Sequence, residues 1–243
     1  KSRWLQQLSS MDNEDDDPGT TWNERARAAH PDRMSPRMAW RAIQSALPRD
    51  AIISSDIGNN CAIGNAYPSF DEGRKYLAPG LFGPCGYGLP AVVGAKIGKP
   101  DVPVVGFSGD GAFGIAVNEL TAIGRGEWPA ITQIVFRNYQ WGAEKRNSTL
   151  WFDDNFVGTE LDEEVSYAGI AQACGLKGVV ARTMDELTAA LDQAIKDQKA
   201  GTTTLIEAMI NQELGEPFRR DAMKKPVAVA GIDAGDMVPQ IGA

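Results

Sequence analysis

A carboxylate stands inside a glycine-rich turn in the stretch FSGDGAFG, residues 107–114. Gly109, Gly111 and Gly114 follow the GxGxxG spacing of turns that bring the backbone close to phosphate groups, and Asp110 lies between the first two. Two negative groups placed side by side are unfavourable unless a cation separates them. The stretch therefore predicts either a plain glycine turn or a site in which Asp110 binds a metal ion that a phosphate also binds.

Asn138 is the second residue whose type and position point to a metal ion. Asp110 ends the apolar segment 102–110, and Asn138 ends the next one, 130–138. If these segments are neighbouring parallel strands, both side chains lie at the same edge of the sheet. Carboxylate and amide oxygens suit Mg²⁺ or Ca²⁺, and Mg²⁺ usually completes its shell with phosphate oxygens and water. The pair predicts a metal ion between Asp110 and a bound diphosphate, with a helix starting near Ala112 offering free N–H groups to the phosphates.

A dinucleotide cofactor is the alternative that the glycine spacing allows. An NAD site expects an acidic residue after the following strand, where it binds the ribose hydroxyl groups. Arg137 and Asn138 occupy that place. A dinucleotide-dependent oxidoreductase is therefore disfavoured.

The elements that must position these residues alternate between strands and helices. Strands are expected at 51–58, 102–110, 130–138, 178–181 and 203–210. Helices are expected at 38–47 after a Ser35–Pro36 cap, at 88–98, 112–126 and 163–175, and from a Thr183–Glu186 capping box to about residue 199. This alternation predicts an α/β fold, a doubly wound and mostly parallel sheet flanked by helices.

Composition divides the chain into three parts and excludes some partners. Residues 1–33 are acidic and are expected to be a linker or the end of a preceding domain, 34–212 the α/β domain, and 213–243 a C-terminal arm. Because the chain begins with Lys1, we expect it to be the C-terminal portion of a longer protein. The net charge of −8 and the lack of a long apolar run argue against nucleic-acid and membrane partners.

The cysteine and histidine content points to a cytoplasmic protein that does not use histidine chemistry. Cys61, Cys85 and Cys174 are widely spaced, without a CxxC pair, which is typical of reduced thiols. His30 is the one histidine of the chain and stands in a polar stretch, so we expect it to be a solvated loop residue. General-base catalysis by histidine within this chain is therefore not expected.

The sequence GDG, followed after 26 residues by Asn138, resembles the metal–diphosphate motif of thiamine diphosphate enzymes. Residues 83–142, from GPCGYGLPAVVGAKIG to FRNYQWG, are similar to the diphosphate-binding domain of the acetolactate synthase and pyruvate oxidase group, and the resemblance extends over about 34–212. It implies thiamine diphosphate and Mg²⁺ as cofactors. Asp110 and Asn138 would bind Mg²⁺ through their side chains and Gln140 through its main-chain carbonyl.

The same resemblance implies a set of cofactor-binding residues. They are Gly58, Asn59, Asn60, Gly83, Cys85, Gly109, Asp110, Gly111, Ala112, Asn138 and Gln140. Gly58, Asn59 and Asn60 match a second diphosphate-contacting loop, and GPCGYG matches the segment under the cofactor rings. Cys85 departs from the pattern, because a larger apolar side chain usually supports the bent cofactor at this position. A buried small residue is the alternative interpretation of Cys85.

Both ends of the chain resemble a narrower family. WLQQLSSMDNEDDDPGTTWNERA and INQELGEPFRRDAMKKPVAVAGI are similar to sulfoacetaldehyde acetyltransferases, which implies conversion of sulfoacetaldehyde and phosphate to acetyl phosphate and sulfite. Such anionic substrates require cationic side chains. The candidates are Lys145, Arg146, Arg219, Arg220, Lys224 and Lys225. A surface helix face for the first two, and a solvated basic tail for the others, are the alternatives.

The catalytic glutamate that the resemblance implies has no counterpart here. The family activates its cofactor with a glutamate from a separate pyrimidine-binding domain, usually on a partner subunit, and neither Glu119 nor Glu207 is assigned that role. We therefore expect a homodimer or homotetramer, and no turnover by this chain alone. A carboligase resembling acetolactate synthase, and a non-catalytic cofactor-binding subunit completed by another chain, remain alternatives.

Overall fold

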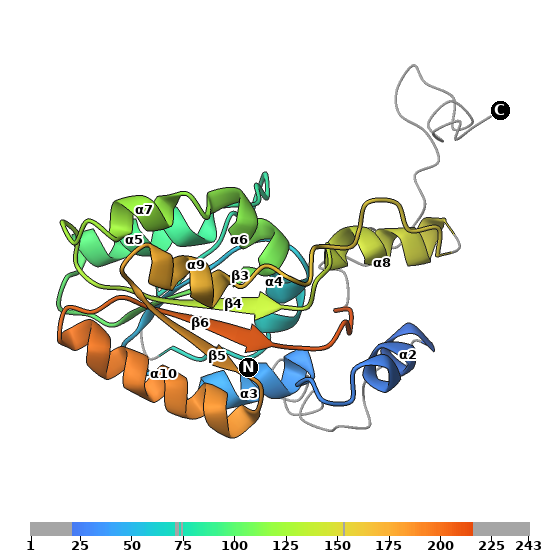
Figure 1. The fold of residues 1–243 in the computed structure, drawn as a ribbon, viewed down its shortest axis with the longest axis horizontal. Coiled ribbons are helices and arrows are strands. Elements are labelled where there is room, and N and C mark those ends of the chain that lie inside the picture. Colours follow the sequence, from blue (N-terminus) through green and yellow to red (C-terminus); the bar gives the residue numbers. More distant parts are fainter. Residues whose placement is uncertain (1–20, 71–72, 74, 153, 216–243) are drawn as a thin grey trace, which may run out of the picture.

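A six-stranded parallel sheet forms the centre of the protein in a computed structural model that describes residues 21–70, 73, 75–152 and 154–215. The strand order is β2-β1-β3-β4-β6-β5 (Figure 1). The strands are β1 (Ile52–Ser55), β2 (Tyr76–Leu77), β3 (Val104–Gly109), β4 (Thr132–Arg137), β5 (Lys177–Ala181) and β6 (Thr204–Met209). All pairs are parallel, which confirms the predicted doubly wound α/β sheet.

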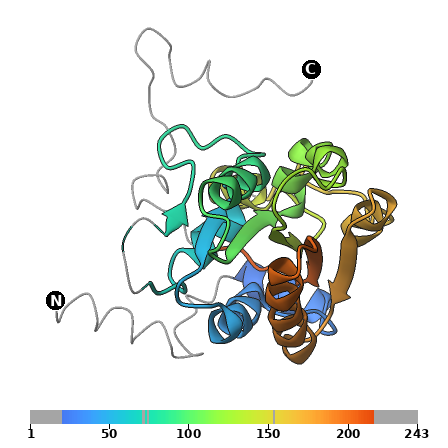
Figure 2. The same ribbon diagram turned by 90° about the vertical axis from the view of Figure 1, so that its left-hand side faces the viewer.

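Helices cover both faces of this sheet and bury two apolar clusters (Figures 1 and 2). One face carries α3 (Pro36–Ala46) and α10 (Met184–Lys199), and the other carries α5 (Gly88–Gly98), α6 (Asp110–Ala116), α7 (Glu119–Ile123) and α9 (Tyr167–Ala173). The short α4 (Asn59–Gly64) follows β1, while α2 (Thr21–Ala29) and α8 (Gly142–Trp151) lie beyond the carboxyl ends of the strands (Figure 1).

Local sequence explains where the predicted elements begin. Strands β4 and β6 are buried along their whole length, as is typical of a parallel sheet with both faces covered. The Ser35 hydroxyl accepts the Arg37 N–H at the start of α3, and the Thr183 hydroxyl accepts the Glu186 N–H at the start of α10. The capping residues thus determine where both helices on this face of the sheet begin.

Several elements differ from the expectation. The helix predicted over 112–126 is divided into α6 and α7. Around Asn118 the chain forms a three-residue turn instead of an α-helical one, because the Leu120 N–H donates to the Val117 carbonyl. The Thr121 hydroxyl also donates to the Asn118 carbonyl. Helices α2, α4 and α8 and the two-residue β2 were not predicted. Within the described part of the chain, no helix is long and apolar enough to cross a membrane.

Candidate active site

A cavity of about 170 Å³ opens at the carboxyl ends of β1, β3 and β4. Its walls come from the chain after β1, from the loop before α5, from the start of α6 and from the segment that joins β4 to α8. All eleven residues expected to bind the cofactor line it: Gly58, Asn59, Asn60, Gly83, Cys85, Gly109, Asp110, Gly111, Ala112, Asn138 and Gln140. The fold thus gathers residues from four separate segments around one space.

Asp110 is held in one orientation by its neighbours at the bottom of this cavity. Its Oδ2 accepts three hydrogen bonds, from Arg137 Nη1 at 3.1 Å, from the Asn138 N–H at 3.0 Å and from the Tyr139 N–H at 2.6 Å. Its Oδ1 accepts the Gly111 N–H at 3.0 Å. Burial raises the pKa of Asp110 to about 6, although Arg137 and these main-chain donors favour the charged form.

The three expected metal ligands converge on the Oδ1 side of Asp110. The Asn138 amide has one terminal atom 3.3 Å from Asp110 Oδ1 and 3.3 Å from the Gln140 carbonyl oxygen. With its nitrogen in that place the amide donates to both oxygens. With its oxygen there, the amide accepts the Gln140 N–H at 3.3 Å and three oxygens face one another, an arrangement that a cation among them would stabilise. This set of one carboxylate, one amide and one carbonyl fits Mg²⁺. Among the described residues, no cluster of three or more His, Cys, Asp or Glu side chains offers another metal site.

The backbone between the two ligands is bent by Tyr139. Its φ of 62° lies in the left-handed region, where a non-glycine residue is strained by about 1–2 kcal/mol. The Arg33 and Arg137 guanidinium carbons lie 4.5 and 4.0 Å from the centre of its ring. These contacts and the short bond to Asp110 hold the turn that brings the Asn138 side chain and the Gln140 carbonyl to one side.

A second part of the cavity wall, after β1, has the features of a phosphate-binding loop. Gly58 has φ 115° and ψ −158°, which only glycine adopts without strain. Asn60 is 8% exposed, and neither its amide oxygen nor its nitrogen has a hydrogen-bond partner among the described residues. A buried amide without partners in a cavity wall fits a polar ligand such as a diphosphate.

The Asn59 side chain, which lines the cavity, also binds the segment that follows β6. Its Nδ2 donates to the Glu213 carbonyl at 3.0 Å, and its Oδ1 accepts the Gly215 N–H at 2.6 Å. Both ends of the amide are therefore used by the segment 211–215 that follows β6. Asn59 fastens this segment to the cavity wall.

Sequence reasoning missed Asp56, which positions the loop containing Cys85. Its carboxylate accepts the N–H groups of Ile57, Gly86 and Gly88 at 2.9, 3.1 and 2.8 Å. Burial raises the pKa of Asp56 despite these donors. The sequence did contain an indication of this role, because Asp56 follows a buried strand just as Asp110 does. Cys85 is half-buried, and burial, followed by the nearby Asp56 and Glu144, raises the pKa of its thiol.

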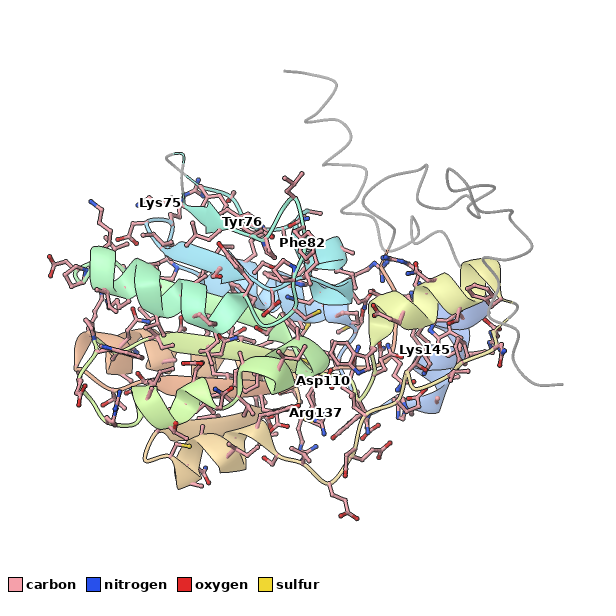
Figure 3. All side chains as sticks on the ribbon, turned by 90° about the horizontal axis from the view of Figure 1, so that it is seen from above. Lys75, Tyr76, Phe82, Asp110, Arg137 and Lys145 are labelled. Atoms are coloured by element: carbon pink, nitrogen blue, oxygen red, sulfur yellow. The ribbon has the colours of Figure 1, made fainter. Side chains whose placement is uncertain are left out.

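The two described cationic candidates do not line the cavity. Lys145 is 3% exposed, so it is not a surface residue. Its ammonium group pairs with Glu160 and lies 5.0 Å from the centre of the Trp22 ring, well away from Asp110 (Figure 3). Arg146 donates to the Gly215 carbonyl at 3.4 Å. Arg219, Arg220, Lys224 and Lys225 lie outside the described residues.

The remaining titratable residues considered from sequence also lie outside the cavity lining. His30 is half-buried directly after α2. Glu119 accepts a bond from Asn118 at the start of α7. Glu207 is buried beside Arg137, with 3.5 Å between Oε1 and Nε. Cys61 and Cys174 are free thiols outside the lining, whereas Cys85, also a free thiol, lines the cavity.

Arg137 is the other residue that sequence reasoning missed. It ends β4, is 1% exposed and contacts Asp110 directly (Figure 3). From sequence it served only to argue against an NAD site. Nothing in its neighbours along the chain indicates that its charge is buried, because the acids that neutralise it come from α6 and β6.

Comparison with known proteins agrees with this geometry. Residues 56–208, more than half of the chain, match the family model described as thiamine pyrophosphate enzyme, C-terminal TPP binding domain. The chain belongs to the thiamine pyrophosphate enzyme family. The matched region contains the cavity loops from Asp56 to Gln140, so thiamine diphosphate is the family's cofactor for this domain.

Two relatives of this thiamine pyrophosphate domain match nearly the whole chain. Sulfoacetaldehyde acetyltransferase of Roseovarius nubinhibens is 90% identical and that of Rhodobacter capsulatus 80% identical, each over 99% of this chain. The chain spans 40% and 41% of their lengths. A solved structure, the thiamine diphosphate-dependent 4-hydroxybenzoylformate decarboxylase of Rhodococcus jostii RHA1, aligns with a TM-score of 0.67 and 24% identity, covering 74% of this chain and 33% of its own. That likeness bears on the fold alone.

Proposed function

We propose that this chain supplies the diphosphate- and metal-binding half of a sulfoacetaldehyde acetyltransferase. The whole enzyme would convert sulfoacetaldehyde and phosphate to acetyl phosphate and sulfite. The relatives at 90% and 80% identity carry this name, and they extend beyond the region that the chain matches. The proposal therefore concerns the protein to which this chain contributes.

The convergence of Asp110, Asn138 and Gln140 at one end of the cavity is the observation that carries the proposal. Their oxygens offer a hard donor set on the same side of the cavity as the Gly109–Ala112 turn. Asn60, unpartnered and buried, faces the same space. Together these residues would hold Mg²⁺ and the diphosphate of the cofactor.

The residues of this chain would bind and orient the cofactor. Thiamine diphosphate, when bound, supplies the carbanion chemistry at its thiazolium ring. Asp110 keeps its Oδ1 toward the metal site because three donors occupy Oδ2. The loop carrying Gly83 and Cys85, fixed by Asp56, would lie under the cofactor rings. Trp40, Ile63 and Phe136 form an apolar part of the wall that limits access of water.

A partner domain and the domain boundaries are parts of the same proposal. No described carboxylate is assigned to activate the cofactor, so we propose that a pyrimidine-binding domain of a partner subunit provides the glutamate, in a homodimer or homotetramer. The linker, domain and arm boundaries at residues 33 and 212 stay a prediction. So does a cytoplasmic location, which the three free thiols favour.

The test is an assay of the full-length protein with thiamine diphosphate, Mg²⁺, sulfoacetaldehyde and phosphate. Sulfite and acetyl phosphate are measured together. Equal amounts of both, with acetyl phosphate lost when phosphate is omitted, support the acetyltransferase. Cofactor binding without sulfite release would reject this substrate in favour of a carboligase. Failure of the full-length protein to react with any carbonyl substrate, with the cofactor bound, would favour a non-catalytic binding subunit.

A further inference from the structure

Arg137 connects the metal site to the core of the domain. Its Nη1 donates to Asp110 Oδ2 at 3.1 Å, and its Nη2 donates to the main-chain carbonyls of Asp162 and Val165, the latter at 3.0 Å. Its Nε lies 3.5 Å from Glu207 Oε1. The guanidinium thus has one partner in the metal site and three partners outside it.

The surroundings of Arg137 leave it little freedom to move. The guanidinium carbon lies 4.0 Å from the centre of the Tyr139 ring and 5.2 Å from that of Tyr167. Glu207 is itself held, because Oε2 accepts the Ser166 hydroxyl at 2.9 Å and the Ala168 N–H at 3.1 Å. The Tyr167 hydroxyl donates to the Asp110 carbonyl at 3.0 Å. A planar fork held in this way therefore meets Asp110 at Oδ2, whereas the Asn138 amide lies near Oδ1.

This arrangement decides which oxygen of Asp110 is available to a metal ion. Oδ2 carries the Arg137 bond and two main-chain bonds, whereas Oδ1 has one main-chain donor and faces Asn138 and the Gln140 carbonyl. Without the guanidinium, the charged Oδ2 would lose its one side-chain donor, and rotation of the carboxylate about χ2 would be less restricted. Outer partners of this kind orient metal ligands and typically change metal affinity by 10–100-fold.

We propose that Arg137 is a positioning residue for the metal site: by holding Asp110 Oδ2 it presents Oδ1 to Mg²⁺ and thereby sets the Mg²⁺ affinity. The inference rests on the proposed role of Asp110 as a metal ligand. It extends that role to a residue that touches neither the metal nor the cofactor.

The test measures metal affinity in the full-length protein without using turnover. Arg137→Met keeps a similar stem but removes the charge and the fork, Arg137→Lys keeps the charge as a single point, and Arg125→Met, an exposed site after α7, controls for loss of a positive charge. Mn²⁺ binding is followed by the EPR signal of the free ion at saturating thiamine diphosphate. Mg²⁺ half-saturation is followed by quenching of tryptophan fluorescence, because Trp141 lines the cavity.

We expect half-saturation to require 10–100-fold more metal in Arg137→Met, a smaller increase in Arg137→Lys and no change in Arg125→Met. Thiamine diphosphate affinity at saturating Mg²⁺ should stay close to that of the wild type, which a general loss of structure would not allow. An unchanged metal affinity in folded Arg137→Met overturns the proposal. If that variant does not fold, unchanged affinity in Arg137→Lys does so. A wild-type protein that binds thiamine diphosphate without any metal would instead overturn the metal assignment itself, and this inference with it.

Discussion

Gly109 and Gly111 serve different purposes although they belong to the same turn. A Cβ built on Gly111 would lie 2.8 Å from the Trp141 ring, whereas a Cβ on Gly109 would have no heavy atom within 4 Å. Both residues line the cavity. At the scale of single residues, Gly111 is therefore required by the protein's own packing, and Gly109 by the space that a ligand would occupy.

Alanine substitutions separate these two purposes. Gly111→Ala forces the Trp141 ring to move, so we expect it to lower the free energy of unfolding by about 1–3 kcal/mol. Gly109→Ala should leave that free energy close to the wild-type value but weaken thiamine diphosphate binding, because its methyl group enters the cavity. Urea unfolding without cofactor and thiamine diphosphate titration with Mg²⁺ measure the two effects. Equal losses of stability in both variants would contradict the distinction.

Asp56 gives a prediction on the pH dependence of stability. Its pKa in the folded protein is raised above the ordinary value of 3.8, mainly by burial. The folded protein therefore holds this proton more strongly than the unfolded chain, so the contribution of Asp56 to stability is present at low pH and is lost as the pH rises through the raised pKa. The neutral amide of an Asp56→Asn variant resembles the protonated acid but does not titrate.

We therefore expect the stability of the wild type, relative to Asp56→Asn, to fall as the pH is raised from about 4 toward 7. Urea unfolding of both proteins at several pH values in this range gives the difference directly. A difference that stays constant, or that grows in favour of the wild type with increasing pH, would show that the main-chain bonds from Ile57, Gly86 and Gly88 outweigh the effect of burial.

At the scale of elements, the unit β3–α6–β4 could be predicted because its information is local. Segments 102–110 and 130–138 are rich in apolar residues, and strands of that kind lie inside parallel sheets. Gly109 pairs with Phe136 in the register, so the polar residues after the two strands meet as expected. The ends of strands were therefore sufficient to place Asp110 and Asn138 in one site.

Helix α2 could not be predicted because its contacts are distant along the chain. The Trp22 indole donates to the Gln212 carbonyl at 3.1 Å, and Asn23 exchanges two hydrogen bonds with Leu214. These partners lie about 190 residues away, and the helix itself carries few apolar side chains. The burial of Arg137 was hidden for the same reason. Local pattern reveals a strand end but not what packs against it.

The segment after β6 links α2 and α3 to the walls of the cavity. The Glu213 side chain is fully buried and pairs with Arg27 Nε and Arg37 Nη1, each at 3.1 Å, while its carbonyl accepts Asn59. Gln212 donates to the Asn138 carbonyl at 3.1 Å. One short segment thus joins both walls of the cavity and is anchored by two arginines.

Arg37→Met tests this anchor. Within the described residues Glu213 pairs with two arginines, so removing one of them should cost about 1–3 kcal/mol, less than complete loss of a buried pair because Arg27 remains. Urea unfolding measures the loss, and the double variant Arg37→Met/Glu213→Gln should recover part of it, since the unpaired charge is then absent. A loss no larger than that of the exposed Arg125→Met would mean that Glu213 does not depend on Arg37.

At the scale of the whole molecule, an apolar loop beside the cavity has no cover within the described chain. Phe82 is 94% exposed (Figure 3) and Leu81 is fully exposed, and the two directly precede Gly83 of the cavity wall. Ile115, near the end of α6, is also exposed. Exposed apolar side chains at the rim of a site are typical of a surface that another domain covers. The chain spans 40% of the length of its 90% identical relative, and the partner domain proposed above would cover this loop.

Phe82→Asp in the full-length protein tests whether this loop forms an interface. A charge placed on a surface that is buried in the assembly must be desolvated without a partner, so we expect sedimentation velocity to show dissociation into smaller species. Because the loop continues into the cavity wall, thiamine diphosphate retained after gel filtration should fall in parallel. Ile97→Asp is the matched control. Ile97 lies in the last turn of α5 and is exposed, but it does not line the cavity. If both variants dissociate, the effect comes from the added charge and not from its position in this loop. If the Phe82→Asp assembly stays intact, the partner covers the cavity without contacting this loop.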